Sequence, residues 1–173
     1  EGAQVVSIFG LDEERTKEVA KTGNIPTIAN SPTEMLGEVD AVIVVFRHGG
    51  LHREYALPFI EQGIPTFVDK PMAITVKDAE AIVDSAVKHD TLLTSFSTLR
   101  YDTSTADFTK GLKDISPVTA GVVTGPADRG SEYGGLPFYG VHIVELMLEA
   151  FGRGVSEVDS VNHHGNIVAR ARY

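Results

Sequence analysis

The stretch PTFVDKPMAITVKDAE, residues 65–80, contains the unit from which the first part of the chain is built. Its apolar start ends at Asp69-Lys70-Pro71, and a helical pattern opens a few residues later. The nearly unbroken apolar run DAVIVVF, residues 40–46, comes one helical segment earlier, and such a run suits a parallel strand that is covered on both faces. The stretch therefore predicts a buried strand, a turn with a charged pair, and a helix.

Strand and helix patterns alternate in this way up to about residue 100. We expect strands near residues 4–9, 41–46, 65–69 and 92–96, parallel and adjacent in one sheet. The helix after Thr75 should bury an apolar stripe made of Val76, Ala79, Val83, Ala86 and Val87. Short connections between the segments predict an α/β fold, with a doubly wound parallel sheet and right-handed crossovers.

The pattern then changes. We expect a helix over residues 103–114, a strand over residues 117–125, and a second helix over residues 141–152. Two strand-like runs follow, on either side of the polar stretch NHHGN. Neighbouring helices and strands predict an α+β second domain that is seen only in part. We therefore place one domain at residues 1–100 and the second, partial domain at residues 101–173.

The composition narrows the classes of function. The 173 residues include 24 acidic and 15 basic residues, and the formal net charge of −9 argues against a nucleic-acid partner, because phosphates need clustered Lys and Arg. The absence of Cys excludes disulfides, thiolate nucleophiles and Cys-ligated metals. No apolar run approaches the roughly 20 residues that a spanning helix needs, and no signal peptide is visible, so we expect a cytoplasmic protein without a membrane partner.

Both ends of the sequence lie within strand-like patterns. The chain opens with EGAQVVSIFG, which has no Met and enters a strand almost at once, and it closes with NIVARARY, which still alternates. Because complete proteins usually end in more polar segments, we expect the chain to be part of a longer protein.

Polar residues follow three of the expected strands, in the stretches FGLDEE, FRHGGLH and DKP. In an open parallel sheet, ligands bind beyond the carboxyl ends of the strands, so these stretches favour a site at one sheet edge. Lys70 precedes a proline, which restricts its backbone and gives the side chain a fixed starting point. A partly buried ammonium there could hold a substrate oxygen; a surface lysine in a strand-to-helix turn is the alternative.

A second candidate lies in YGGLPFYGVHIVE, residues 133–145. His142 falls in the first turn of a helix, and Glu145 lies three residues later on the same face. A neutral imidazole at this position could pass protons near neutral pH. A histidine that is simply satisfied by Glu145 explains the same residues equally well.

Two other kinds of site are not expected. His48 and His52 have helical i, i+4 spacing and His163-His164 are adjacent, but no carboxylate falls at a familiar zinc-site spacing around them, so we predict no metal. Neither GxGxxG nor GxxxxGKS/T occurs in the sequence, so a phosphate loop is not supported.

Three segments, in order along the chain, resemble the Gfo/Idh/MocA family of nicotinamide-dependent oxidoreductases. The family's segment around a Lys-Pro pair is similar to VDAVIVVFRHGGLHREYALPFIEQGIPTFVDKPMA, in which Lys70 falls on its Lys and Asp69 stands for its usual Glu. The strand that ends in an Arg-aromatic pair is similar to LLTSFSTLRYD. The family pattern GG...D.G.H..D is similar to GGLPFYGVHIVE, in which His142 falls on its His and Glu145 on its later acidic residue.

The resemblance implies a Rossmann-like domain followed by an α+β domain with an open, mainly antiparallel sheet, and a homo-oligomer built through that sheet. It implies NAD or NADP as cofactor, with hydride transfer to or from a carbinol carbon of a sugar, cyclitol or related small molecule. Lys70 and His142 correspond to the family's catalytic or substrate-orienting pair, and the peptide bond before Pro71 is often cis. The residues expected to contact the cofactor are Gly10, Asp12, Phe46, Arg47, His48, His52, Asp69, Lys70 and Arg100.

The sequence departs from the family pattern around the cofactor. The glycine fingerprint belongs before residue 1 and is not in this sequence. Gly10, with Asp12 nearby, replaces the acidic residue that usually holds the adenine ribose, so the choice between NAD and NADP stays open. Arg47-His48 stand where the family usually has Thr-Pro.

A further departure concerns the acid–base residues. The family's Asp, four residues before the His, is Phe138 here, and Tyr139 follows it. The phenol of Tyr139 could substitute for the missing acid as a third catalytic residue, and an aromatic packing residue explains the position equally well.

Two hypotheses of function follow. Lys70, His142 and Glu145 favour an NAD(P)-dependent oxidoreductase, whereas Phe138 and Gly10 favour a relative that keeps the fold without turnover and binds a ligand or forms an oligomer. A flavodoxin-like response module would need an acidic phosphoacceptor cluster at the strand ends, and the sequence has none there.

Overall fold

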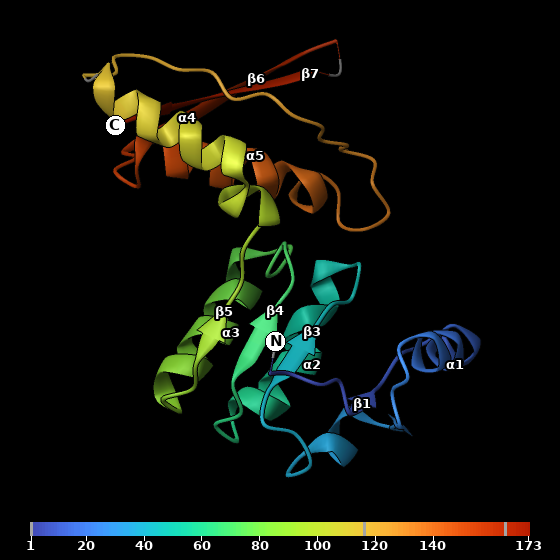
Figure 1. Ribbon diagram of the computed structural model, residues 1–173. Coiled ribbons are helices and arrows are strands. Elements are labelled where there is room, and N and C mark those ends of the chain that lie inside the picture. The colour runs from blue at the N-terminus through green and yellow to red at the C-terminus, as the bar shows by residue number, and fades with distance from the viewer. Residues whose placement is uncertain (1, 116, 165) are drawn as a thin grey trace. The chain divides into compact units, whose positions relative to one another are not determined.

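The computed structural model describes residues 2–115, 117–164 and 166–173. Its internal contacts divide the chain into two compact units (Figure 1). The first comprises the residues up to Phe96 together with Arg129–Phe138, and the second comprises Ser97–Asp128 and Tyr139–Tyr173. The segment 129–138 therefore packs with the first unit although it lies far along the chain. The domain limits expected near residue 100 stay a prediction.

The described part of the first unit contains five short strands in two parallel sheets. β1 (Ser7–Ile8) pairs with β2 (Thr27–Ile28), and the second sheet has the order β3 (Val42–Val44), β4 (Thr66–Val68), β5 (Leu93–Thr94). The parallel pairing expected for β3, β4 and β5 is confirmed. The expectation of one sheet is wrong, because among the described residues β1 pairs with β2, which the sequence did not predict.

Helices connect these strands and begin at capped positions. Their bounds are α1 (Glu13–Thr22), α2 (His52–Ile60) and α3 (Val76–Lys88), with short 3-10 turns η1 (Pro32–Met35) and η2 (Gly49–Leu51). The hydroxyl of Thr75 accepts a hydrogen bond from the backbone N–H of Asp78 at 3.1 Å, as expected for an N-cap. Hydrogen bonds from Thr75 and Arg53 lower the pKa of Asp78, so a charged contact joins the start of α3 to α2.

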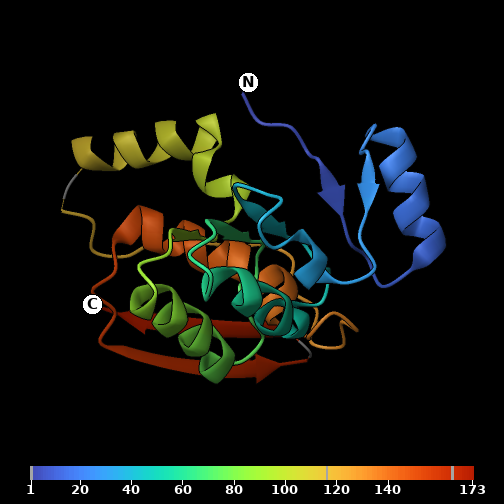
Figure 2. The same cartoon turned by 90° about the horizontal axis from the view of Figure 1, so that it is seen from below.

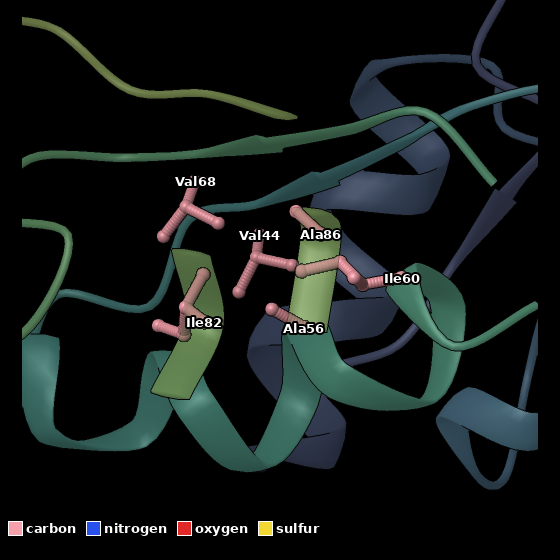
Figure 3. Close-up of a cluster of buried hydrophobic side chains, with 6 residues drawn as sticks. All are labelled: Val44, Ala56, Ile60, Val68, Ile82 and Ala86. Carbon is pink, nitrogen blue, oxygen red and sulfur yellow. The ribbon is translucent and has the colours of Figure 1, made fainter. Parts of the chain in front are cut away.

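The core of the first unit lies between the second sheet and two helices. α2 and α3 pack against each other, and α2 contacts β3 and β4 (Figure 1). The side chains of this core come from both layers and point toward one another in Figure 3: Val44, Ala56, Ile60, Val68, Ile82 and Ala86. This packed layer fixes where β3 and β4 end relative to each other, and so it positions the turns that follow them.

The buried face of α3 differs from the predicted stripe. Ile82 and Ala86 are buried, whereas Val76, Val83 and Val87 are exposed. At 100° per residue, the three valines lie about 100–140° around the helix from Ile82. The predicted stripe is therefore rotated around the helix from the buried face, which contains Ile82 and Ala86.

The second unit contains two helices and an antiparallel strand pair among its described residues. The elements are η3 (Thr98–Tyr101), α4 (Thr103–Asp114), α5 (Pro137–Phe151), β6 (Glu157–His163) and β7 (Asn166–Arg172). β6 and β7 run side by side in both views (Figures 1 and 2), which confirms the expected antiparallel sheet. The first two residues of α5, Pro137 and Phe138, group with the first unit.

The strand expected over residues 117–125 is wrong, since no part of that range is a strand. The segment contains Gly121, and a Cβ at this glycine would collide with the ring of Phe151 on α5. The segment thus packs its backbone directly against a helix side chain. Within the described part of the chain, no helix is long and apolar enough to cross a membrane.

We predict that Ile82→Ala lowers the free energy of unfolding by about 2–5 kcal/mol, because it removes a fully buried side chain from a close-packed layer. The matched control is Val87→Ala on the same helix, where the side chain is 76% exposed, and its effect should stay within about 0.5 kcal/mol. Urea unfolding followed by circular dichroism measures both. Equal effects would contradict the assignment of the buried face.

Candidate functional site

Two turns follow neighbouring parallel strands at one edge of the second sheet. β3 leads into Phe46-Arg47-His48, and β4 leads into Asp69-Lys70-Pro71. The carboxyl ends of parallel neighbours lie at the same edge, which is where ligands bind in open α/β sheets. The Lys70–Pro71 peptide bond is cis, as expected, and the Lys70 side chain is half-buried.

The backbones of the two turns come into close contact at Gly49. A Cβ at Gly49 would lie 2.9 Å from the carbonyl oxygen of Pro71, closer than real Cβ contacts come. Only a glycine lets the backbone after β3 approach the Lys70-Pro71 turn this closely. The sequence pattern GG at residues 49–50 therefore has a packing reason at the candidate site.

His52 is a buried connection between the same two turns. Its side chain is 0% exposed, and its Nε2 lies 2.7 Å from the carbonyl oxygen of Phe46 while its Nδ1 lies 3.0 Å from that of Pro71. Both neighbours are carbonyl oxygens, and a neutral imidazole carries one N–H, so one ring nitrogen donates to the backbone while the other lies close to the second carbonyl. The buried ring of His52 therefore helps to hold the two turns together, and its expected contact with the cofactor stays a prediction.

The side chain of His48 caps the short turn that follows it. Its Nδ1 accepts a hydrogen bond from the N–H of Gly50 at 3.1 Å and so caps the turn η2. Among residues 2–115, 117–164 and 166–173, no group of three or more His, Asp or Glu is placed to hold a metal ion. Of the other histidine pair, the side chain of His163 lies outside the described residues.

Two aromatic rings of the segment 129–138 lie against the cations of these turns. The guanidinium of Arg47 lies 4.2 Å from the centre of the Tyr133 ring, and the ammonium of Lys70 lies 5.0 Å from that of Phe138. The two rings are 5.0 Å apart. Such distances are typical of cation–π contacts, so π faces lie beside both cations at this edge.

Tyr133 carries an additional polar contact. Its hydrogen bond with Glu132 raises the pKa of the Tyr133 phenol above its usual value, and the positive charge of Arg47 acts in the opposite direction. The phenol therefore stays a neutral donor at ordinary pH. No motif in the sequence pointed to Tyr133; only its place next to the glycines of 134–135, which allow close backbone packing, could have drawn attention to it.

The second unit holds the predicted histidine in a different way from the one expected. Nδ1 of His142 lies 2.6 Å from the hydroxyl of Ser97, and the backbone N–H of Ser97 donates to Oε2 of Glu145 at 2.9 Å. Ser97 is 0% exposed. His142 and Glu145, one turn apart on α5, thus both contact Ser97, which sequence reasoning missed even though it follows β5 closely, as Lys70 follows β4.

Two other predicted residues lie in the second unit. The ring of Tyr139 is 5.8 Å from that of His142, so the closeness inferred from their spacing holds. Arg100 donates to Glu149 at 3.0 Å in a partly exposed ion pair. Its expected cofactor contact stays a prediction.

The first sheet places the remaining cofactor candidates after β1. The carboxylate of Asp12 accepts from the backbone N–H of Arg15 at 2.9 Å and so caps α1. A Cβ at Gly10 would collide with the hydroxyl of Thr16, which donates to the carbonyl oxygen of Asp12 at 2.6 Å. The space that an acidic side chain at residue 10 would need is therefore filled by a buried threonine.

Comparison with known proteins agrees with this architecture. Residues 1–96 match the model of the Gfo/Idh/MocA group, described as an oxidoreductase family with an NAD-binding Rossmann fold. The chain is 39% identical over 105 residues to an inositol 2-dehydrogenase from Agrobacterium fabrum, and 30% identical over 104 residues to one from Burkholderia cenocepacia. Each match covers 58% of this chain and 31% of the relative, so the chain matches about a third of the length of these relatives.

Solved structures share the fold. A myo-inositol dehydrogenase from Lactobacillus casei, in complex with NAD(H) and myo-inositol, has a TM-score of 0.78 at 20% identity, covering 95% of this chain and 51% of that one. A probable dehydrogenase from Thermotoga maritima has a TM-score of 0.77 at 20% identity, with 91% and 51% covered. At this level of identity the likeness concerns the fold.

We predict that His52→Ala lowers the free energy of unfolding by about 2–4 kcal/mol, because it empties the space of a fully buried ring and leaves the carbonyl group to which the ring donates without that donor. His48→Ala, at a half-buried capping position, should cost about 1 kcal/mol or less. Chemical denaturation of both variants tests the difference. A His52→Ala protein as stable as His48→Ala would show that the ring does not hold the turns.

Proposed function

Since the chain belongs to the Gfo/Idh/MocA family of oxidoreductases, we propose that the intact protein transfers a hydride between NAD or NADP and a carbinol carbon of a sugar, cyclitol or related polyol. The observation that carries this proposal is Lys70 at the carboxyl end of β4, in a turn fixed by Gly49 and His52. Relatives named inositol 2-dehydrogenase and 1,5-anhydro-D-fructose reductase support the substrate class. We place the protein in the cytoplasm as part of the same proposal.

The residues at the sheet edge suit a dinucleotide. The planar guanidinium of Arg47, which lies over the Tyr133 ring, presents N–H donors that suit phosphate oxygens. Gly10 offers no carboxylate for the ribose hydroxyl, so we propose NAD or NADP without a preference. When bound, the nicotinamide would supply the hydride acceptor or donor, and the residues of this chain would bind it, orient the substrate and move the proton.

The charges of His142 and Lys70 determine which step of the reaction we assign to each residue. An alcohol loses hydride only as its hydroxyl loses a proton, so a base must come within hydrogen-bond reach, roughly 2.6–3.2 Å. We assign this role to His142, with Tyr139 in reserve. Lys70 would stabilise the developing alkoxide through a charge-assisted hydrogen bond. The ring of Phe138 beside its ammonium attracts a cation without neutralising it, which supports this electrostatic role.

Phe138 also supports the second candidate function. It is buried and fills, with an apolar ring, the position at which the family pattern has an acid. A protein without that acid could keep the fold and bind a small ligand without turnover. The two candidates differ in whether the intact protein oxidises any polyol with either nucleotide.

We predict that Lys70→Ala and His142→Ala each lower kcat about 10²–10⁴-fold with little change in cofactor affinity, because both act on the reacting hydroxyl. Steady-state kinetics with whichever polyol is oxidised measures kcat, and quenching or enhancement of nucleotide fluorescence measures affinity. Lys77→Ala, which removes an exposed lysine of α3, is the matched control and should keep full activity.

Two results would change the assignment. Near-normal turnover in His142→Ala would remove His142 as the base and move that role to Tyr139. An intact wild-type protein that oxidises no member of a broad polyol panel with NAD or NADP would favour the non-catalytic candidate.

We propose in addition a homo-oligomer built through the β6–β7 sheet. One face of this sheet carries the cross-strand pairs Val158–Ala171 and Asn162–Ile167, and Val158 is 64% exposed. The other face carries the ion pair between Arg170 and Asp159 together with the exposed pair Val161–Val168, so only the first face is uncharged, and both faces expose valine. An exposed apolar sheet face of this kind is commonly covered by a partner.

We predict that the intact protein scatters light as a dimer or larger assembly at micromolar concentration, and that Val158→Asp shifts it toward the monomer, because the substitution places a charge on the apolar face. Asp159→Asn on the opposite face is the control. A monomeric wild-type protein would contradict the proposal.

A further inference from the structure

Arg47 places an exposed guanidinium at the sheet edge where open α/β folds bind ligands. Its central carbon lies 4.2 Å from the centre of the Tyr133 ring. Within the part of the chain that the structure describes, the Arg47 side chain forms no ion pair and no hydrogen bond. A π face stabilises the positive charge but accepts few of the N–H donors of a guanidinium. Those donors are therefore available to a ligand.

Close packing at glycine holds the ring of Tyr133 in place. A Cβ at Gly134 would lie 2.5 Å from Cγ2 of Ile74, and a Cβ at Gly50 would lie 3.2 Å from Cδ1 of the same side chain. Gly134 also has a φ of +104°, which other residues rarely adopt. The segment that carries Tyr133 thus packs on the turn after β4 through its backbone. The aromatic support of Arg47 is therefore part of the fold of the first unit.

The ring of Phe138 lies near both cations of this edge. Its centre is 5.9 Å from the guanidinium carbon of Arg47 and 5.0 Å from the ammonium of Lys70, so one small molecule can reach both charges. The family pattern has Thr in place of Arg47 and Asp in place of Phe138. The first difference adds a positive charge and the second removes a negative one. Both differences make this edge more positive than the pattern.

The acidic residues of the same segments do not cancel this gain of positive charge. Asp69 stands where the family pattern already has an acid, so it leaves the difference unchanged. Glu132 accepts the hydroxyl hydrogen of Tyr133 and forms no ion pair with Arg47. The charge of Arg47 is therefore left to be paired by a ligand.

We propose that Arg47 binds an oxyanion of the substrate, a carboxylate or a phosphate, so that this protein acts on an acidic sugar or cyclitol. The inference rests on the proposed function, in which Lys70 holds the reacting hydroxyl. A guanidinium suits either group because its N–H donors bind two oxygens at once. A phosphate of the nucleotide is the competing partner of Arg47. The substrate is favoured because Arg47 and Lys70 lie near the same ring, so that one small molecule can meet both.

The first test measures the discrimination between matched probes by the intact protein. D-Glucose and D-galactose are compared with their uronates and their 6-phosphates, and the ratio of kcat/KM for the acidic to the neutral probe is recorded. We expect a ratio above about 10 in the wild type and a ratio about 10–100-fold lower in Arg47→Ala, as for the loss of a charge-assisted hydrogen bond. The acidic probe that is favoured identifies the group as carboxylate or phosphate.

Two further variants separate geometry from charge. Arg47→Lys keeps the charge without the planar fork of donors, so its ratio should fall between those of the wild type and Arg47→Ala. Arg153→Ala removes an exposed arginine of the second unit and is the matched control, with an unchanged ratio.

A binding measurement does not depend on turnover. Isothermal titration calorimetry of the same probes, with the protein saturated with NADH, should show tighter binding of an acidic probe than of its neutral partner, and Arg47→Ala should lose this preference. A wild type that binds no acidic probe more tightly than its neutral partner would overturn the inference. An Arg47→Ala protein that keeps the preference and binds NADH about 10-fold more weakly would assign Arg47 to the nucleotide and overturn it as well. If the wild type binds an acidic probe through Arg47 and oxidises none of the probes with NAD or NADP, the oxyanion site stands and the proposed function fails.

Discussion

The contact between a buried imidazole and two backbone carbonyls is the constraint on which the sheet edge depends. His52 lies between the start of the turn after β3 and the Lys70–Pro71 turn, within hydrogen-bond distance of a carbonyl group of each. Gly49 removes the side chain that would keep them apart. A buried polar group is costly unless it is fully paired, so this arrangement is stable only when both turns are in place. The position of the Lys70–Pro71 turn therefore depends on the buried ring of His52.

Sequence patterns predicted the layers of the first unit well and its details less well. Unbroken apolar runs identified β3 and β4, and a threonine cap identified the start of α3, because burial on both faces and capping leave local signals. The separate pairing of β1 with β2 left no such signal, since two-residue strands are too short for a periodic pattern. The buried face of α3 was misjudged because three valines lie together on one side of the helix, about 100–140° from Ile82, and form an apolar stripe that is exposed.

The residues of the candidate site were likewise only partly predictable from the sequence. Lys70 and His142 were predictable because each lies beside a recognisable pattern, a strand end or a helix start. Ser97 and Tyr133 were not, because their roles depend on contacts across 45 and more than 80 residues of chain. Such contacts are decided by tertiary packing, which a single sequence does not display. The burial of His52 was missed for the same reason. Histidines at i, i+4 spacing suggest a pair of metal ligands, whereas in this fold the His52 ring contacts backbone carbonyl groups.

The collision between Gly10 and Thr16 has a consequence for how this protein can evolve. An acidic residue at position 10 would have to arrive together with a smaller residue at position 16, because the buried threonine occupies the space of any side chain there. A larger residue at position 10 alone would overpack the start of α1, and a smaller residue at position 16 alone would leave it underpacked. Each single substitution would therefore lower stability. Under the proposed function, the gain of a ribose-binding carboxylate at position 10 would therefore require two coupled substitutions.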